Sequence, residues 1–173
     1  MVTGGNALDF QQSCLSHENG FYLEAIILEY AAIESRLECI CGVLGLPCNK
    51  ELNPKQRGSI KISKRIVCLK KVRNRNRELF EKCKLKDDFF YKSTGLGEWT
   101  EVRNNYVHGL YKDVIKYSAR NRSMKKDAED GYEIARLLYN ETKRLRRLKN
   151  SKPELFENII CPQKEACYLN DKK

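Results

Sequence analysis

The chain has 173 residues, of which 33 are lysine or arginine and 23 are aspartate or glutamate, giving a net charge of +10. This length suits one domain, or one domain with a tail, and it allows a core without disulfides, because a domain of about 150 residues buries roughly 70% of its unfolded surface. Hydrophobic residues make up 41% of the chain at helical spacings, and only 10 glycines and 4 prolines are present, which excludes a disordered or fibrous protein and disfavours a turn-rich all-β fold.

The N-terminal third predicts two helices. A short one covers residues 8–16, and a long one covers 21–46, where apolar residues recur three and four positions apart. Gly45 and Pro47 mark the end of the long helix. Charged residues interrupt its apolar run, so we expect no membrane-spanning segment. Residues 1–12 lack a basic patch followed by an apolar block, so we expect no secretory signal and a cytoplasmic protein.

The middle of the chain predicts two more helices joined by turns. The first covers residues 61–84, and its apolar stripe is interrupted by an exposed basic segment at 73–77. A turn-rich connection over 87–97 follows, and it contains three adjacent aromatic residues. The second helix then runs from 97 to 116.

The last predicted helix covers residues 124–150. Ser123 is its expected N-cap, because a serine side chain accepts hydrogen bonds from the free backbone amides of a first turn. Pro153 closes the domain, which we place at residues 1–152, and we expect a loosely ordered tail over 153–173. These elements predict an all-α fold, an up-and-down bundle of about four to five helices.

The eight cysteines include no Cys-x-x-Cys pair, and two of them lie inside strongly helical patterns. We interpret them as free thiols in a reducing compartment. Two other interpretations stay open. One is a disulfide in the tail between Cys161 and Cys167. The other is a metal site, although Cys-x-Cys spacing suits zinc poorly, formed by Cys39, Cys41, Cys48 and His17.

The positive charge is concentrated in two segments. Residues 1–50 carry a net charge of −4, residues 55–86 carry 13 basic and two acidic residues, and residues 143–152 add six basic residues and no acid. Such concentration is typical of a surface that faces a polyanion, and we expect nucleic acid. The other interpretation is a solvated helix face. The residues that we expect to follow a nucleic-acid backbone are Lys61, Lys64, Arg65, Arg73, Arg75 and Arg77.

The densest cluster of chemical groups lies in residues 98–111. On a helix with about 100° per residue, apolar side chains gather on one side. A polar group gathers on roughly the opposite side, formed by Glu101, Asn104, His108 and Tyr111. Such a face is either solvated surface or a site. Arg103 lies about 140° from His108 around the helix, so a site that needs both is easier to build where two copies meet across a two-fold axis.

The segment Arg103-Asn-Asn-Tyr-Val-His108 resembles the signature of the HEPN superfamily (higher eukaryotes and prokaryotes nucleotide-binding). That signature is an arginine, usually followed by a polar residue, with four to six positions before a histidine. Four residues separate the two here, and Asn104 is the polar follower. The resemblance covers residues 8–150 by architecture and the six residues of the motif by sequence.

The resemblance implies a specific activity. HEPN domains are helical bundles that usually dimerise and place paired motifs in a shared cleft, and many are metal-independent endoribonucleases of toxin–antitoxin or phage-defence systems. By this resemblance, His108 would be the general base or acid for attack by the RNA 2′-hydroxyl. Arg103 would hold the scissile phosphate, and Asn104 would orient the histidine or the phosphate. No cofactor or metal is expected, because the RNA supplies its own nucleophile.

Glu101 and Tyr111 are candidate neighbours of this site. In a toxin branch of the family a tyrosine lies two residues after the histidine and is modified with nucleotides. Here that position is Leu110 and the tyrosine comes one residue later, so the branch pattern is not reproduced. A packed aromatic with its hydroxyl at the rim is the other interpretation of Tyr111.

We therefore expect a homodimeric HEPN-type endoribonuclease that acts on RNA and has an acidic antitoxin as a possible protein partner. Two alternatives remain. One is a non-catalytic binder of nucleic acid or nucleotides with the same fold. The other is a protein-interaction module whose basic faces meet an acidic protein.

Overall fold

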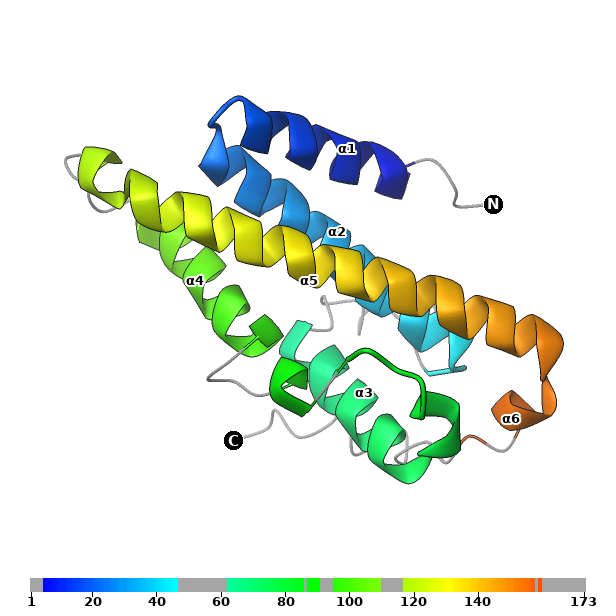
Figure 1. Cartoon of the computed structure of the whole chain (residues 1–173). Coiled ribbons are helices and arrows are strands. Elements are labelled where there is room, and N and C mark those ends of the chain that lie inside the picture. The colour runs from blue at the N-terminus through cyan, green and yellow to red at the C-terminus, as the bar shows by residue number, and fades with distance from the viewer. Residues whose placement is uncertain are drawn as a thin grey trace, which may run out of the picture. The chain divides into compact units, whose positions relative to one another are not determined.

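The computed structural model describes residues 5–46, 62–85, 87–90, 95–109, 117–157 and 159. This part of the chain contains six α-helices, two 3-10 turns and no strand, so the predicted all-α fold is confirmed (Figure 1). The elements are α1 (Gly5–Glu18), α2 (Tyr22–Val43), α3 (Ile62–Arg75), η2 (Glu78–Phe80), η3 (Asp87–Phe90), α4 (Gly95–Gly109), α5 (Tyr117–Ser151) and α6 (Glu154–Glu157).

The chain divides into two compact units. Unit 1 consists of Met1–Ser35 and Asp87–Leu138, and unit 2 consists of Arg36–Lys86 and Tyr139–Lys173. Helices α2 and α5 therefore contribute residues to both units. Each unit has its own buried apolar residues, and each is described by itself below.

In unit 1, α1 and the first part of α2 form a helical hairpin (Figure 1). Gly20 has a φ of 77°, and its amide donates to His17 O at 3.1 Å. The amide of Phe21 donates to Ser16 O at 2.8 Å. These two bonds form a Schellman cap, in which glycine is preferred because a left-handed backbone is strained for other residues. The cap ends α1 and reverses the chain into α2.

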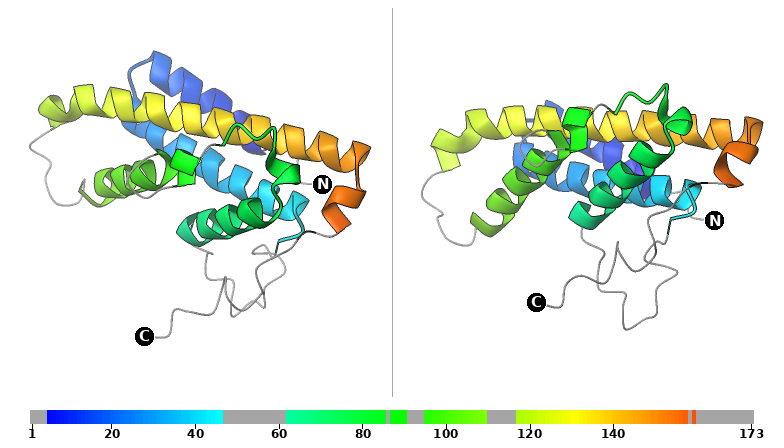
Figure 2. Two further views of the ribbon diagram at one scale, coloured as in Figure 1. Left: turned by 60° about the horizontal axis from the view of Figure 1, so that its bottom comes forward. Right: turned by 90° about the horizontal axis from the view of Figure 1, so that it is seen from below.

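Helix α4 is attached to α5 within unit 1 (Figure 2). The indole N–H of Trp99 donates to the backbone oxygen of Asp127 at 2.7 Å, and the hydroxyl of Tyr106 donates to the Asp127 carboxylate. The expected turn-rich connection before α4 contains the turn η3, which packs against α4. Its Phe89 and Phe90 are both buried and meet edge to face. These contacts hold the helix that carries the motif.

Unit 2 is built on α3, the last part of α2 and the last part of α5. Its largest fully buried side chains are Leu37, Ile40, Leu46, Leu69, Val72, Leu85 and Leu145. Arg144 joins two segments, because its guanidinium donates to Leu79 O at 3.0 Å and to the Glu141 carboxylate at 2.6 Å. Lys149 Nζ donates to Val43 O at 2.9 Å, which satisfies a carbonyl of the last turn of α2.

The end of α2 was predicted correctly. Gly45 has a φ of 67°, and the amides of Gly45 and Leu46 donate to Gly42 O and Cys41 O in a second Schellman pattern. Pro47 lies outside the described residues.

Two predicted helix boundaries were wrong. Helix α3 ends at Arg75 rather than near residue 84, and Asn76 Nδ2 donates to Val72 O at 2.7 Å where it ends. Helix α5 begins at Tyr117, so Ser123 lies inside it rather than at its N-cap. The segment from 117 to 124 contains no glycine or proline, and an interior serine lowers helix stability by well under about 1 kcal/mol, so nothing in it stops the helix.

The predicted tail begins with one turn of helix, α6, in which the amide of Phe156 donates to Pro153 O at 2.8 Å. Beyond Glu157 only Ile159 belongs to the described residues. Within the described part of the chain, none of the helices combines the length and the apolar character that crossing a membrane requires.

Candidate functional site

The motif residues all belong to one helix of unit 1. Arg103 and Asn104 lie in the middle of α4, and the backbone of His108 lies in its last turn. The side chain of His108 and the whole of Tyr111 lie outside the described residues. The motif is thus on a helix, as predicted, and Trp99 and Tyr106 fix that helix to α5 from the apolar side.

The Arg103 guanidinium is held from two directions. Its Cζ lies 3.9 Å from the ring centroid of Tyr30, and its Nη1 donates to Asn104 Oδ1 at 2.9 Å. Tyr30 in turn stacks on Trp99, with centroids 6.4 Å apart and 22° between the planes. A cation over an aromatic face and a directional hydrogen bond together restrict the orientation of the guanidinium.

Arg103 keeps hydrogen-bonding capacity beyond these contacts. Its Nε atom is buried and has no hydrogen-bond partner within the described part of the chain. A guanidinium offers five N–H donors, and Asn104 takes one of them. The arrangement therefore suits an acceptor with several oxygens, such as a phosphate, provided that it reaches the guanidinium edge.

Asn104 has a contact that the sequence did not predict, because its side-chain oxygen accepts a hydrogen bond from its neighbour Arg103. Its expected role toward His108 stays a prediction, since the side chain of His108 lies outside the described residues. Adjacent residues on a helix usually point apart, but the long arginine side chain reaches back to the amide. Glu101, the other described member of the polar face, is exposed.

Tyr30 is the residue of this site that the sequence reasoning did not single out. It belongs to the apolar stripe of α2, yet it is only half-buried, and its ring lies against the Arg103 guanidinium. The available signal was a tyrosine among aliphatic residues in the apolar stripe of α2.

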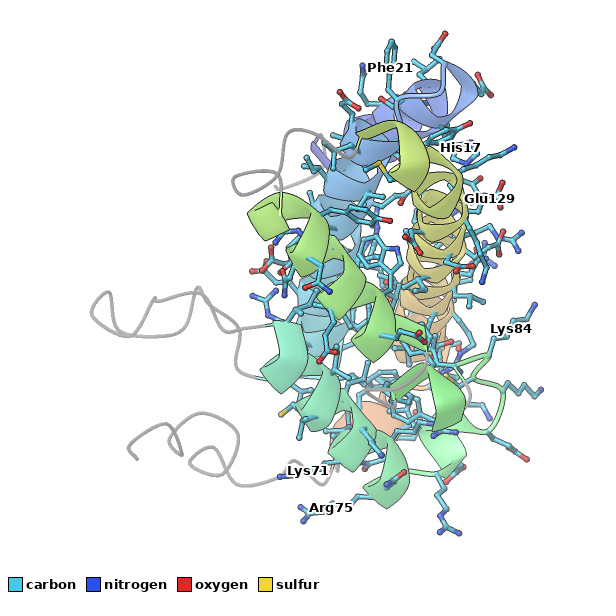
Figure 3. The ribbon with its side chains drawn as sticks, turned by 90° about the vertical axis from the view of Figure 1, so that its left-hand side faces the viewer. His17, Phe21, Lys71, Arg75, Lys84 and Glu129 are labelled. Atoms are coloured by element: carbon cyan, nitrogen blue, oxygen red, sulfur yellow. The ribbon has the colours of Figure 1, made fainter. Side chains whose placement is uncertain are left out.

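The six residues proposed to follow a nucleic-acid backbone differ in their exposure to solvent. Arg75 and Arg77 are exposed and Arg73 is half-buried, all in unit 2. Figure 3 shows Lys71, which was not on the predicted list, projecting outward from α3 with Arg75. Lys61 and the side chain of Lys64 lie outside the described residues.

The prediction that Arg65 lies on a surface that faces nucleic acid is wrong, because this residue is 4% exposed. Its position explains the burial: it lies three residues after Ile62 and four before Leu69, both of which are buried. That spacing places Arg65 on the apolar stripe of α3. It therefore does not offer its charge to a partner in solution.

The division into units sharpens the charge pattern. Unit 2 contains 24 lysines and arginines and 9 aspartates and glutamates, a net charge of +15, whereas unit 1 contains 9 and 14, a net charge of −5. The positive excess of the whole chain therefore belongs to unit 2, and the motif helix belongs to the unit of opposite sign.

The described cysteines have no disulfide partner among the residues of known placement. They are Cys14, Cys39, Cys41, Cys68 and Cys83. Burial raises the pKa of the Cys83 thiol to about 12, with the nearby Glu141 carboxylate acting in the same direction. Such a thiol stays protonated and is a poor nucleophile at neutral pH. Cys48, Cys161 and Cys167 lie outside the described residues.

A cavity of about 270 Å³ opens in unit 1 beside α1 and α5, and Figure 3 labels two of its lining residues, His17 and Glu129. The other lining residues are Cys14, Glu18, Tyr132 and Glu133. The described residues hold no group of three histidines, cysteines or carboxylates with metal-binding geometry. Three carboxylates make this cavity unfavourable for a phosphate.

Comparison of the chain with protein-family models, with curated proteins and with solved structures gives no match. The candidate site therefore stands on the geometry of α4 and its neighbours in unit 1.

Proposed function

We propose that the chain is a metal-independent endoribonuclease of the HEPN type, acting on RNA at a site shared by two copies. The observation that carries the proposal is the fixed orientation of the Arg103 guanidinium, which Tyr30 and Asn104 hold in place. Arg103 belongs to α4, the helix that also carries His108. An oriented guanidinium and a histidine are a suitable pair for phosphate chemistry, because the guanidinium stabilises negative charge and the histidine exchanges a proton near neutral pH.

In the proposed reaction His108 accepts the proton of an RNA 2′-hydroxyl. The 2′-oxygen then forms a bond to the adjacent phosphorus, the bond to the 5′-oxygen breaks, and that oxygen takes up a proton from a histidine as it leaves. Arg103 donates hydrogen bonds to the phosphate oxygens as their negative charge increases. The products are a 2′,3′-cyclic phosphate and a 5′-hydroxyl.

The proposal includes a homodimer. Arg103 and His108 are five positions apart, which separates their positions by about 140° around one helix, and in the proposal a second copy related by a two-fold axis supplies the other group from its own α4. A ribonuclease that is active in its own cell would cut the RNA of that cell unless an inhibitor binds it. We therefore propose a toxin or phage-defence role in the cytoplasm. The proposed inhibitor is an acidic antitoxin that binds unit 2, whose net charge is +15.

The test is RNA cleavage in the presence of EDTA. We expect wild-type protein to cut RNA under these conditions and to leave cyclic-phosphate ends. His108→Ala should lower the cleavage rate by roughly 10²- to 10⁴-fold, the usual contribution of a general acid–base residue, while circular dichroism stays unchanged.

His17→Ala is the matched control, because the chain has two histidines and His17 lies on α1, outside the motif. Its cleavage rate should remain close to that of wild type. Cutting by His108→Ala at the wild-type rate would remove His108 from the mechanism.

The charge of unit 2 favours a second candidate function, RNA binding without cleavage. In that case RNA binds with an affinity that falls as salt rises, and no cyclic-phosphate ends appear.

A further inference from the structure

Tyr139 is an aromatic side chain on the surface of unit 2. It lies in α5 at the start of the part that belongs to unit 2, and it is 38% exposed, one of the few large hydrophobic side chains so placed in the described chain. Core packing therefore does not explain why an aromatic residue occupies this position. An exposed aromatic ring can stack on another planar group.

Two cations lie against this ring. The Arg36 Cζ atom is 4.8 Å from the ring centroid, and the Lys143 Nζ atom is 4.4 Å from it. The pKa of the Tyr139 hydroxyl is lowered, chiefly by its hydrogen bond with Lys143. A ring and two long cationic side chains thus form one cluster, contributed by α2 and α5 of the same unit.

The same face of α5 continues the positive charge. Lys143 and Arg146 follow Tyr139 at four and seven positions, with Arg147 beside them, and all three are exposed. Two arginines of α5 pair with a glutamate three residues earlier, Arg136 with Glu133 and Arg144 with Glu141, each at 2.6 Å. Arg146 and Arg147 have a lysine and an arginine at that position, and neither has an ion pair within the described residues.

We infer that Tyr139, Arg36, Lys143 and Arg146 form a binding surface for single-stranded RNA, on which one base stacks on the Tyr139 ring and the basic side chains contact the neighbouring phosphates. This inference rests on the proposal that the chain acts on RNA, and it names the form of RNA. A duplex hides the faces of its bases, whereas a single strand offers them for stacking on aromatic side chains.

The dimensions and the charge agree with this ligand. Tyr139 and Arg146 are about 10 Å apart along the helix axis, which is roughly the length of three stacked nucleotides. The surface lies in the unit with a net charge of +15. An acidic protein would also meet that charge, but it has no need of an exposed ring beside two cations, so RNA is the ligand that uses every member of the cluster.

The experiment measures binding in the His108→Ala background, where the RNA stays intact if the chain is a nuclease. Fluorescence anisotropy compares an unpaired single-stranded RNA with a duplex of equal length. Tyr139→Leu should weaken single-strand binding by about 5- to 150-fold and leave duplex binding within about twofold. Tyr139→Phe keeps the ring and should bind the single strand like the parent protein.

A second variant tests the phosphate contact. Arg146→Gln should weaken both RNAs and should reduce the slope of log affinity against log salt by about 0.7 for the single strand and about 0.9 for the duplex. Lys126→Gln is the charge-matched control, because Lys126 is exposed on α5 but belongs to unit 1, and it should change neither affinity nor slope.

The outcomes separate this inference from the nuclease proposal. Equal single-strand affinity in Tyr139→Leu and its parent overturns the inference, as does an equal loss for single strand and duplex. Binding of poly-glutamate with no binding of RNA overturns it in favour of a protein partner. Cleavage by the protein with intact His108 is measured in parallel and decides the nuclease proposal. If RNA binding depends on Tyr139 but no RNA is cut, the binding surface is confirmed and the nuclease proposal is overturned.

Discussion

Glu29 is a buried carboxyl group in the core of unit 1. It is 0% exposed, its Oε1 accepts a hydrogen bond from Ser13 Oγ at 3.0 Å, and its Oε2 has no partner among the described residues. Burial raises the pKa of this carboxyl from 4.5 to about 8, against a smaller lowering by Ser13. The group is therefore protonated in the folded protein at neutral pH, since a buried charge without a partner is costly.

This burial predicts a pH dependence of stability. Between pH 4.5 and about 8 the unfolded chain has lost the proton of Glu29 while the folded chain keeps it. The unfolded state thus binds fewer protons, and the free energy of unfolding falls as pH rises through that window. Below this window Glu29 is protonated in both the folded and the unfolded state, so it does not lower the free energy of unfolding there.

Glu29→Gln should remove this dependence, because its amide keeps an acceptor for Ser13 but does not ionise. Relative to wild type, we expect the variant to gain stability between pH 5 and pH 8, by an amount on the order of a few kcal/mol, measured by urea unfolding at both pH values. Glu24→Gln, on the exposed face of the same helix, is the control. A stability difference that is equal at the two pH values would contradict the prediction.

At the residue scale, the sequence predicts one helix that carries both Arg103 and His108, and helix α4 does carry both. Their role in a site stays a prediction. The contact of Arg103 with Tyr30 was not foreseeable, because it joins residues more than seventy positions apart, and no local pattern encodes such a pair. Arg65 was misplaced because its charge was given more weight than its spacing from Ile62 and Leu69.

At the scale of elements, Gly131 determines how closely α5 approaches its neighbours in unit 1. A Cβ atom built on it would lie 2.5 Å from Trp99 Cζ2 and closer still to Glu29 Oε2. Neither neighbour is free to move, because Trp99 is hydrogen-bonded to Asp127 and Glu29 is fully buried. The glycine is therefore needed for close packing and not for backbone freedom.

Gly131→Ala should destabilise the protein by about 1–3 kcal/mol through overpacking, even though alanine favours helix by about 1 kcal/mol. Gly42→Ala is the matched control, because Gly42 lies in α2 and a Cβ there meets nothing within 4 Å. That control should be neutral or slightly stabilising. Urea unfolding of both variants gives the comparison, and equal effects would show that α5 does not pack as described.

Element boundaries were predictable where a backbone signal exists. Gly45 ends α2 as expected, since its positive φ is a conformation that glycine adopts without strain. The end of α3 was missed because Leu79 continues the buried spacing through the turn η2, so the burial pattern persists after the α-helix stops. Periodicity reports which residues are buried and does not distinguish a helix from the turn that follows it.

At the scale of the whole molecule, the charge separates into a unit of −5 and a unit of +15. If unit 2 binds RNA, exposed cations of α3 should contribute as well as those of α5. The pair Lys71 and Arg75 lies one turn apart on α3, and both side chains are exposed (Figure 3).

Replacing both Lys71 and Arg75 by glutamine should weaken RNA binding and reduce the salt slope by roughly 1.4, because each single-strand phosphate contact contributes about 0.7. Replacing Lys125 and Lys126, two exposed lysines of unit 1, removes the same charge and should leave the slope unchanged. Affinity measured over a series of salt concentrations gives both slopes. Equal slopes in the two double variants would exclude α3 from the RNA-binding surface.

The composition of each unit from two separate stretches of chain has a practical consequence for anyone who wishes to isolate them. A truncation at residue 86 removes the second stretch of each unit: η3, α4 and the first part of α5 from unit 1, and the rest of α5 with α6 from unit 2. Neither unit can be expressed as a simple fragment, and a stop codon before α5 removes part of the acidic unit together with part of the basic one. Separate study of the two units therefore calls for co-expressed segments or a circularly rearranged gene.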